Sequence, residues 1–249
     1  MFDFSQVENQ EIARRVKKEA TQFMAWCHYG CQGVDKTEQD VKDAVHRLLD
    51  SGFMARSFDT EIVYIPLAKS MLGDRIPLHS AISYPMGRTT VTQKLRDLDR
   101  AWQIGVRDTC LCIDWQALFS GRYADLETEA AEIMKRFGDA FIKLAFTIPS
   151  TLMSPTETLC VMRALDSAGV VSVKVNPGAK LGVSFEEVAF IKRHFPNRFD
   201  VHPSGNIRSL GEVERYLEMG CDNIHTISSL DITLDFINKR LLKYGGMLA

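Results

Sequence analysis

The chain has 249 residues, of which 45% are hydrophobic and 25% charged, and its formal net charge is -2. This composition is typical of a soluble globular protein, and the weak charge argues against a nucleic-acid partner. No apolar run approaches the roughly 20 residues that cross a bilayer. The charged segment 1–20 also lacks the apolar centre of a secretion signal. We therefore expect a cytoplasmic protein with no nucleic-acid or membrane partner.

Short apolar runs alternate with helical patterns from the N-terminus almost to the C-terminus. A short amphipathic helix is expected within residues 1–20. Strands are then expected at residues 24–30, 53–59, 78–85, 108–114, 141–148, 170–176, 199–205 and 223–229. Helices are expected between and after them, at residues 37–52, 65–72, 91–105, 126–138, 155–169, 185–195, 210–220 and 234–245.

This alternation predicts an α/β fold with a parallel sheet. Eight units joined by short connections, in a chain of this length, fit a closed (β/α)₈ TIM barrel better than an open sheet. No glycine-rich dinucleotide fingerprint follows the first strand. We expect one barrel domain over residues 1–249, with residues 1–20 as an N-terminal helical extension.

Six cysteines are spread along the chain, and nothing in the sequence indicates that they pair as disulfides. Cys27 and Cys31 with His28, or Cys110 with Cys112, could be considered as zinc ligands. Neither pair has the two-residue spacing of a zinc chelate loop. We therefore interpret the cysteines as buried small residues and expect no metal.

Lys174 lies on the expected sixth strand, VVSVKVNPG, where it is flanked by valines. Active sites of such barrels form at the carboxyl ends of the strands. Desolvation and a nearby cation lower the pKa of a lysine and so provide a free amine, the form that a Schiff-base nucleophile requires. The alternative is an ion-paired or surface-reaching strand lysine.

Two other charged residues are candidates for the same site. Lys143 could be the second cation, or it could be an ion-paired barrel lysine. Asp114 has the same parity as Cys110 on the fourth strand and could supply a carboxylate at the rim, or it could cap a loop.

Three segments near the C-terminus suit a phosphate: residues 176–180, 203–209 and 226–231. Each follows an expected strand, and the backbone N–H groups of such turns form an anion site at helix N-termini. Arg208, Ser228 and Ser229 could add side-chain donors. The loops after strands seven and eight are the usual phosphate site of these barrels.

With these residues identified, most of the chain resembles the deoxyribose-phosphate aldolase family. The resemblance is carried by segments 33–45, 81–106, 112–129, 170–178, 201–210 and 227–230. It implies a TIM barrel without metal or cofactor and a Schiff base on Lys174. It also implies that Gly178, Gly205, Arg208, Ser228 and Ser229 surround a substrate phosphate; we add Lys180 and Asn206 from the same loops.

The sequence departs from the family pattern at three positions. His202 occupies the place of the family's second catalytic lysine, Cys110 that of its relay aspartate, and Asn206 that of a glycine. His202 could move protons in place of the lysine, while Lys143 and Asp114 could supply what was lost. We therefore expect a class I aldolase, an aldehyde-lyase that acts on a small sugar phosphate or aldehyde and could form a homodimer. The alternatives are an aldolase or transaldolase-like enzyme for another phosphorylated sugar or keto acid, and a non-catalytic phosphate-binding barrel.

Overall fold

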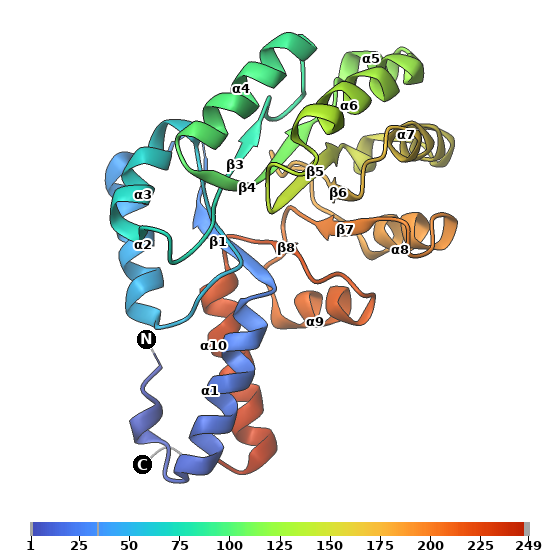
Figure 1. Cartoon of the computed structure of the whole chain (residues 1–249). Coiled ribbons are helices and arrows are strands. Elements are labelled where there is room, and N and C mark those ends of the chain that lie inside the picture. Colours follow the sequence, from blue (N-terminus) through green and yellow to red (C-terminus); the bar gives the residue numbers. More distant parts are fainter. Residues whose placement is uncertain (1, 34, 247–249) are drawn as a thin grey trace.

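Eight parallel strands form a TIM barrel in the computed structural model, which describes residues 2–33 and 35–246 (Figure 1). The strands are β1 (Cys27–Cys31), β2 (Phe58–Thr60), β3 (Leu78–Ile82), β4 (Val106–Cys112), β5 (Lys143–Ile148), β6 (Ser172–Val175), β7 (Asp200–Pro203) and β8 (Ile224–His225). Neighbours along the chain are paired from β1 to β7, and β8 pairs with β1. A bridge between Ser204 and His225 completes the ring. The predicted fold is confirmed.

Helices follow the strands and cover the outside of the barrel (Figure 1). They are α1 (Gln10–Met24), α2 (Glu38–Ser51), α3 (Ile65–Leu72), α4 (Val91–Gln103), α5 (Trp115–Phe119), α6 (Tyr123–Phe137), α7 (Pro155–Ser167), α8 (Phe185–His194), α9 (Leu210–Glu218) and α10 (Ser229–Tyr244). Single 3-10 turns lie at Phe4–Gln6, Ile62–Tyr64 and Ser150–Leu152. Among the described residues, no helix is both long and apolar enough to cross a membrane.

Local sequence explains most helix boundaries. Thr37 caps α2 through a capping box with Asp40, and Gly52 ends that helix in the left-handed conformation. The N-terminal helix is longer than expected because it runs to Met24. It packs against α10 (Figure 1), where the rings of Phe23 and Phe236 stack with centroids 4.4 Å apart. The single domain that we expected also includes Met1, Val34 and residues 247–249, which lie outside the described residues.

Alternation along the strands separates the two sides of the barrel wall. On β6, Val173 and Val175 are fully buried on one side, whereas Ser172 and Lys174 have the opposite parity. Parallel pairing places Thr147 beside Lys174, and Lys174 beside His202. The strand register therefore brings polar side chains from neighbouring strands together inside the barrel.

Candidate active site inside the barrel

Lys174 lies in the barrel interior at the end of β6, with only 5% of its surface exposed. Its Nζ donates a hydrogen bond to the Sγ of Cys110, at 3.7 Å. Cys110 is also buried, and burial raises the pKa of its thiol. The structure thus brings two of the predicted catalytic residues into contact.

The charge state of Lys174 differs from the sequence prediction. Burial lowers the pKa of Lys174, but the Cys110 sulfur and the Asp59 carboxylate together raise it above its ordinary value. The prediction of a lowered pKa was therefore wrong for the resting site. The largest contribution that raises this pKa comes from Cys110 on β4, followed by the buried carboxylate of Asp59 on β2, and neither contact could be seen from β6 alone.

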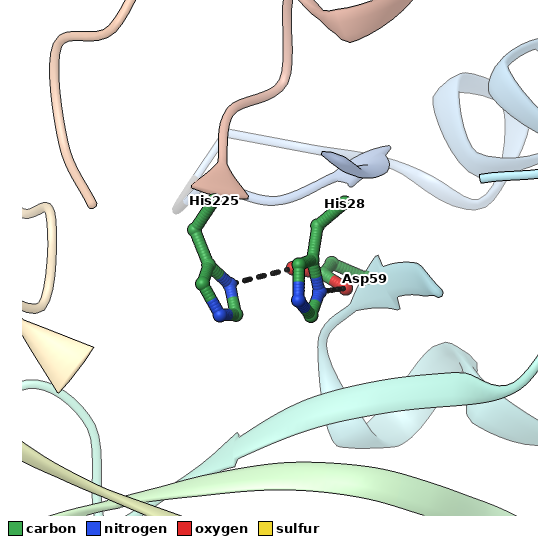
Figure 2. A group of neighbouring side chains, drawn as sticks. All are labelled: His28, Asp59 and His225. Atoms are coloured by element: carbon green, nitrogen blue, oxygen red, sulfur yellow. Dashed lines mark hydrogen bonds and ion pairs between the residues drawn. The ribbon is translucent and has the colours of Figure 1, made fainter. Parts of the chain in front are cut away.

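A group of imidazoles surrounds that carboxylate on the other wall of the barrel. Asp59 comes from β2, His28 from β1, His79 from β3 and His225 from β8, and all four side chains are buried. Figure 2 shows the rings of His28 and His225 side by side, with a nitrogen of each directed at Asp59. We call these four residues the imidazole–carboxylate cluster.

Distances within the cluster are short. The Nδ1 atom of His28 lies 3.0 Å from the Oδ1 of Asp59, and that of His79 lies 3.5 Å from the same oxygen. The Nδ1 of His225 is 3.4 Å from the Oδ2 of Asp59. Ser57 adds a hydroxyl 2.6 Å from both Asp59 and His28.

Protonation in the cluster follows from its burial. Burial lowers the pKa of His79 to about 3 and that of His225 well below its usual range. Burial alone would raise the pKa of Asp59, but the imidazoles of His79 and His28 hold it well below its ordinary value. At neutral pH the cluster therefore presents an ionised carboxylate facing the neutral rings of His79 and His225.

His202 is linked to this cluster through one amide. The Nδ2 of Asn223 lies 3.1 Å from the Nε2 of His202, and its Oδ1 contacts the Nε2 of His28. The Nε2 of His202 is also 3.0 Å from the Oδ2 of Asp200. Burial lowers the pKa of His202 to about 4, although Asp200 opposes the shift. His202 is therefore a neutral ring beside Lys174.

Lys143 does not lie where the second cation was expected. It begins β5, four residues before Thr147, and its ammonium forms an ion pair with Asp200 at the start of β7. This pair is in the amino-terminal part of the barrel, away from the strand ends. This geometry is that of the ion-paired alternative, and a role for Lys143 as the second catalytic cation stays a prediction.

Asp114 also lies outside the site. Its carboxylate accepts a hydrogen bond from the backbone N–H of Gln116 and caps the short helix α5. It lines a surface cavity of about 470 Å³, together with Arg88, Arg122 and Glu129. This geometry is that of the loop-capping alternative, and the part of the chain that the structure describes shows no hydrogen bond or ion pair between Asp114 and Lys174.

The loops after β6, β7 and β8 adjoin one another at the rim. The N–H of Val183 donates to the carbonyl of Gly205, and the hydroxyl of Thr226 donates to the carbonyl of Ile207. A Cβ atom at Gly205 would lie 2.1 Å from the carbonyl oxygen of Leu181, so this approach requires glycine. The structure thus brings the three predicted phosphate segments together.

The predicted phosphate residues differ in their environments. Lys180, Asn206 and Arg208 are exposed, and Lys180 and Asn206 have positive φ, as do Gly178 and Gly205. Ser228 caps α10, and the hydroxyl of Ser229 is buried without a hydrogen-bond partner among the described residues.

Sequence analysis missed the imidazole–carboxylate cluster, apart from weighing His28 as a zinc ligand beside cysteines. Cys27 and Cys31 have the opposite strand parity to His28 and do not join it. The signal was nevertheless present, because each histidine stands within a short apolar strand at a position that faces the interior. Only the closure of β8 against β1 brings them together.

Tyr84 was also missed. It follows β3, and its hydroxyl reaches the loop after β6, 3.9 Å from where a Cβ of Gly178 would lie. Burial raises the pKa of Tyr84, and the charge of Lys174 opposes that shift. The hydroxyl of Tyr84 therefore adjoins the loop after β6, one of the three predicted phosphate segments.

Comparisons with known proteins agree with this architecture. No family model matches the chain. It is 23% identical over 201 residues to a deoxyribose-phosphate aldolase from Caldanaerobacter subterraneus subsp. tengcongensis, covering 79% of this chain and 85% of that protein. It is 21% identical over 165 residues to one from Treponema denticola, covering 66% of this chain and 76% of that protein.

Solved structures show the same fold. An aldolase named QR15 superimposes with a TM-score of 0.78 at 20% identity, covering 88% of this chain and 98% of that one. The tetrameric deoxyribose phosphate aldolase from Aeropyrum pernix gives a TM-score of 0.77 at 19% identity, with 90% and 97% covered.

Proposed function

We propose that this chain, a distant relative of the deoxyribose-phosphate aldolases, is a class I aldolase, an aldehyde-lyase that uses Lys174 as its Schiff-base residue. The single observation that carries the proposal is the buried amine of Lys174 at the carboxyl end of β6. In TIM barrels this end of the strands holds the catalytic groups.

The reaction follows from the chemistry of an amine and a carbonyl. The Nζ of Lys174, once deprotonated, adds to the substrate carbonyl, and loss of water gives an iminium. Loss of the proton from the hydroxyl on the β-carbon lets the bond between the α- and β-carbons break: the β fragment leaves as an aldehyde, and the iminium accepts the bonding electron pair, which leaves an enamine. Protonation of the enamine carbon and hydrolysis of the resulting iminium then release the product and restore the lysine.

Proton transfer is assigned to His202, with Cys110 beside the amine. His202 is adjacent to Lys174 in register, and its Nδ1 is buried without a hydrogen-bond partner among the described residues. Its lowered pKa keeps it neutral at neutral pH, so that Nδ1 is available to accept a proton. This role replaces that of the lysine found in the related family.

The substrate class is a small sugar phosphate or aldehyde. The phosphate would bind at the adjoining loops after β6, β7 and β8, where backbone N–H groups and exposed cations meet. The proposed contacts are Gly178, Lys180, Gly205, Asn206, Arg208, Ser228 and Ser229. The changes at His202, Cys110 and Asn206 favour a substrate that differs from deoxyribose 5-phosphate. Assembly into a homodimer stays a prediction.

Borohydride trapping tests the proposal. The protein is incubated with a panel of short aldehydes and sugar phosphates, reduced, and digested for peptide mass spectrometry. We expect a reduced adduct on Lys174 and none in Lys174→Met, while Lys69→Met, a change in a surface ion pair, traps as the wild type does. An adduct on another lysine, or no adduct with any substrate, would overturn the assignment.

A further inference from the structure

The imidazole–carboxylate cluster has more nitrogen atoms than its hydrogen bonds use. Neither ring nitrogen of His79 has a hydrogen-bond partner among the described residues, and the Nδ1 of His225 also lacks one. Both residues are buried, and both direct Nδ1 toward the carboxylate of Asp59 at 3.4 to 3.5 Å. Unpartnered buried nitrogens cost free energy unless another group satisfies them.

We propose that His28, Asp59 and His225 bind one divalent transition-metal ion of the zinc class inside the barrel, with His79 beside it as a further nitrogen ligand. The three side chains come from adjacent strands, β8, β1 and β2, so the closed sheet fixes their separation (Figure 2). One ligand atom from each lies within 4.8 Å of the others.

Ligand spacing fits such an ion. Zinc–nitrogen and zinc–oxygen bonds of about 2.0–2.2 Å in a tetrahedron place the ligand atoms about 3.3 Å apart. The Nδ1 atoms of His28 and His225 lie 3.0 and 3.4 Å from the carboxylate oxygens of Asp59. The two rings stack with centroids 3.5 Å apart, so both must rotate about χ2 to point their lone pairs at one ion. That torsion is soft for histidine.

Ligand chemistry selects the class of ion. Imidazole nitrogens suit zinc, cobalt, nickel, copper or iron, whereas calcium and magnesium prefer sets of oxygen ligands. Asp59 supplies a negative charge, and the Nε2–H of His28 donates to the Oδ1 of Asn223, which leaves Nδ1 as the nitrogen of that ring with a lone pair. A divalent cation would also compensate the buried charge of Asp59.

The position of this ion matters for the proposed aldolase. Asp59 is one of the groups that raise the pKa of Lys174. A cation bound to Asp59 would reverse that influence and favour the free amine, which is the electrostatic task of the second lysine in the related family. This consequence rests on the proposed function, whereas the binding site itself does not.

Cobalt binding tests the site directly. Chelator-treated protein is titrated with Co²⁺ while visible absorption is followed, and bound metal is counted by mass spectrometry. We expect one Co²⁺ per chain, with a visible absorption spectrum typical of an ion of low coordination number. Added Zn²⁺ should displace this Co²⁺. His225→Gln and Asp59→Asn should each weaken binding at least tenfold, whereas His46→Gln, on the exposed side of α2, should leave it unchanged.

The outcomes separate this inference from the proposed function. Lys174→Met should bind cobalt as the wild type does while it traps no aldehyde. Absence of one-to-one binding in folded wild-type protein, or equal binding by His225→Gln when circular dichroism shows that it is folded, would overturn the metal site. Neither result would remove the expected adduct on Lys174, and a failure to trap would not affect cobalt binding.

Discussion

The two walls of the barrel interior carry different chemistry. The wall made by β4 to β7 holds Lys174, the proposed nucleophile, and the buried thiol of Cys110. The wall made by β8 and β1 to β3 holds Asp59 among imidazoles. The amine of Lys174 is influenced from both walls, because the Cys110 sulfur on its own wall and the Asp59 carboxylate on the opposite wall both raise a pKa that burial alone would lower.

Removing the carboxylate of Asp59 should have the largest effect on the difference between the two walls, and on the free energy of unfolding. Asp59→Asn leaves His28 and Ser57 without the anion that they contact inside the barrel. A hydrogen bond to a charged group contributes about 1.5–3 kcal/mol to stability, and its buried partner is left unsatisfied when that group is removed. We expect a loss of this size in urea unfolding of the chelator-treated protein.

The matched control is Asp74→Asn, which removes the exposed partner of Lys69 and should change stability little. Equal unfolding midpoints for Asp59→Asn and the wild type would show that the carboxylate is not held by the imidazoles.

Acid should act next, through the buried imidazoles of both walls. His202 has a pKa lowered to about 4, against about 6.5 when unfolded, so the unfolded chain binds more protons between these values. Stability from this ring is present above pH 6.5 and is lost as pH falls toward 4, by about 3 kcal/mol. His79 and His225 act in the same direction, while Asp108, whose pKa burial raises to about 6, opposes them.

Unfolding measured from pH 7 to pH 4 checks this sign. His202→Gln should flatten the decline, and His46→Gln should not. A stability that rises as the pH falls through this range would contradict the burial of neutral rings.

The contrast also shows what the sequence could predict. The alternation of strands and helices could be predicted from local sequence patterns. Lys174 could be identified because it is a charged residue between valines on an expected buried strand. The cluster could not be predicted, because His28 and His225 are nearly 200 residues apart and meet only when the barrel closes. Lys143 and Asp114 were assigned by parity alone, which gives the side of a strand but not the height along the barrel axis.

A substitution at Lys143 tests whether the position of a residue along the barrel axis matters as well as the side of the strand on which it lies. Its ion pair with Asp200 lies in the amino-terminal part of the barrel, so Lys143→Met should cost about 1–3 kcal/mol of stability by leaving a partly buried carboxylate without its ammonium. Trapping on Lys174 should continue at the wild-type rate. Lys69→Met is the matched surface control for stability, and a large fall in trapping would restore Lys143 to the catalytic site.

The smallest expected effect is that of a substitution at the rim of the barrel, in the proposed phosphate site. Arg208 is exposed on the loop after β7, and its guanidinium bonds only the carbonyl of Ile207 among the described residues. Loss of one phosphate contact by Arg208→Gln should raise KM about tenfold for a phosphorylated substrate, or about 1.4 kcal/mol. The kcat for an unphosphorylated aldehyde should not change, because that substrate never uses the contact. Steady-state kinetics with both substrates, and with Arg163→Gln on the exposed face of α7 as control, measure the difference. An equal loss with both substrates would mean that Arg208 supports the loop rather than the phosphate.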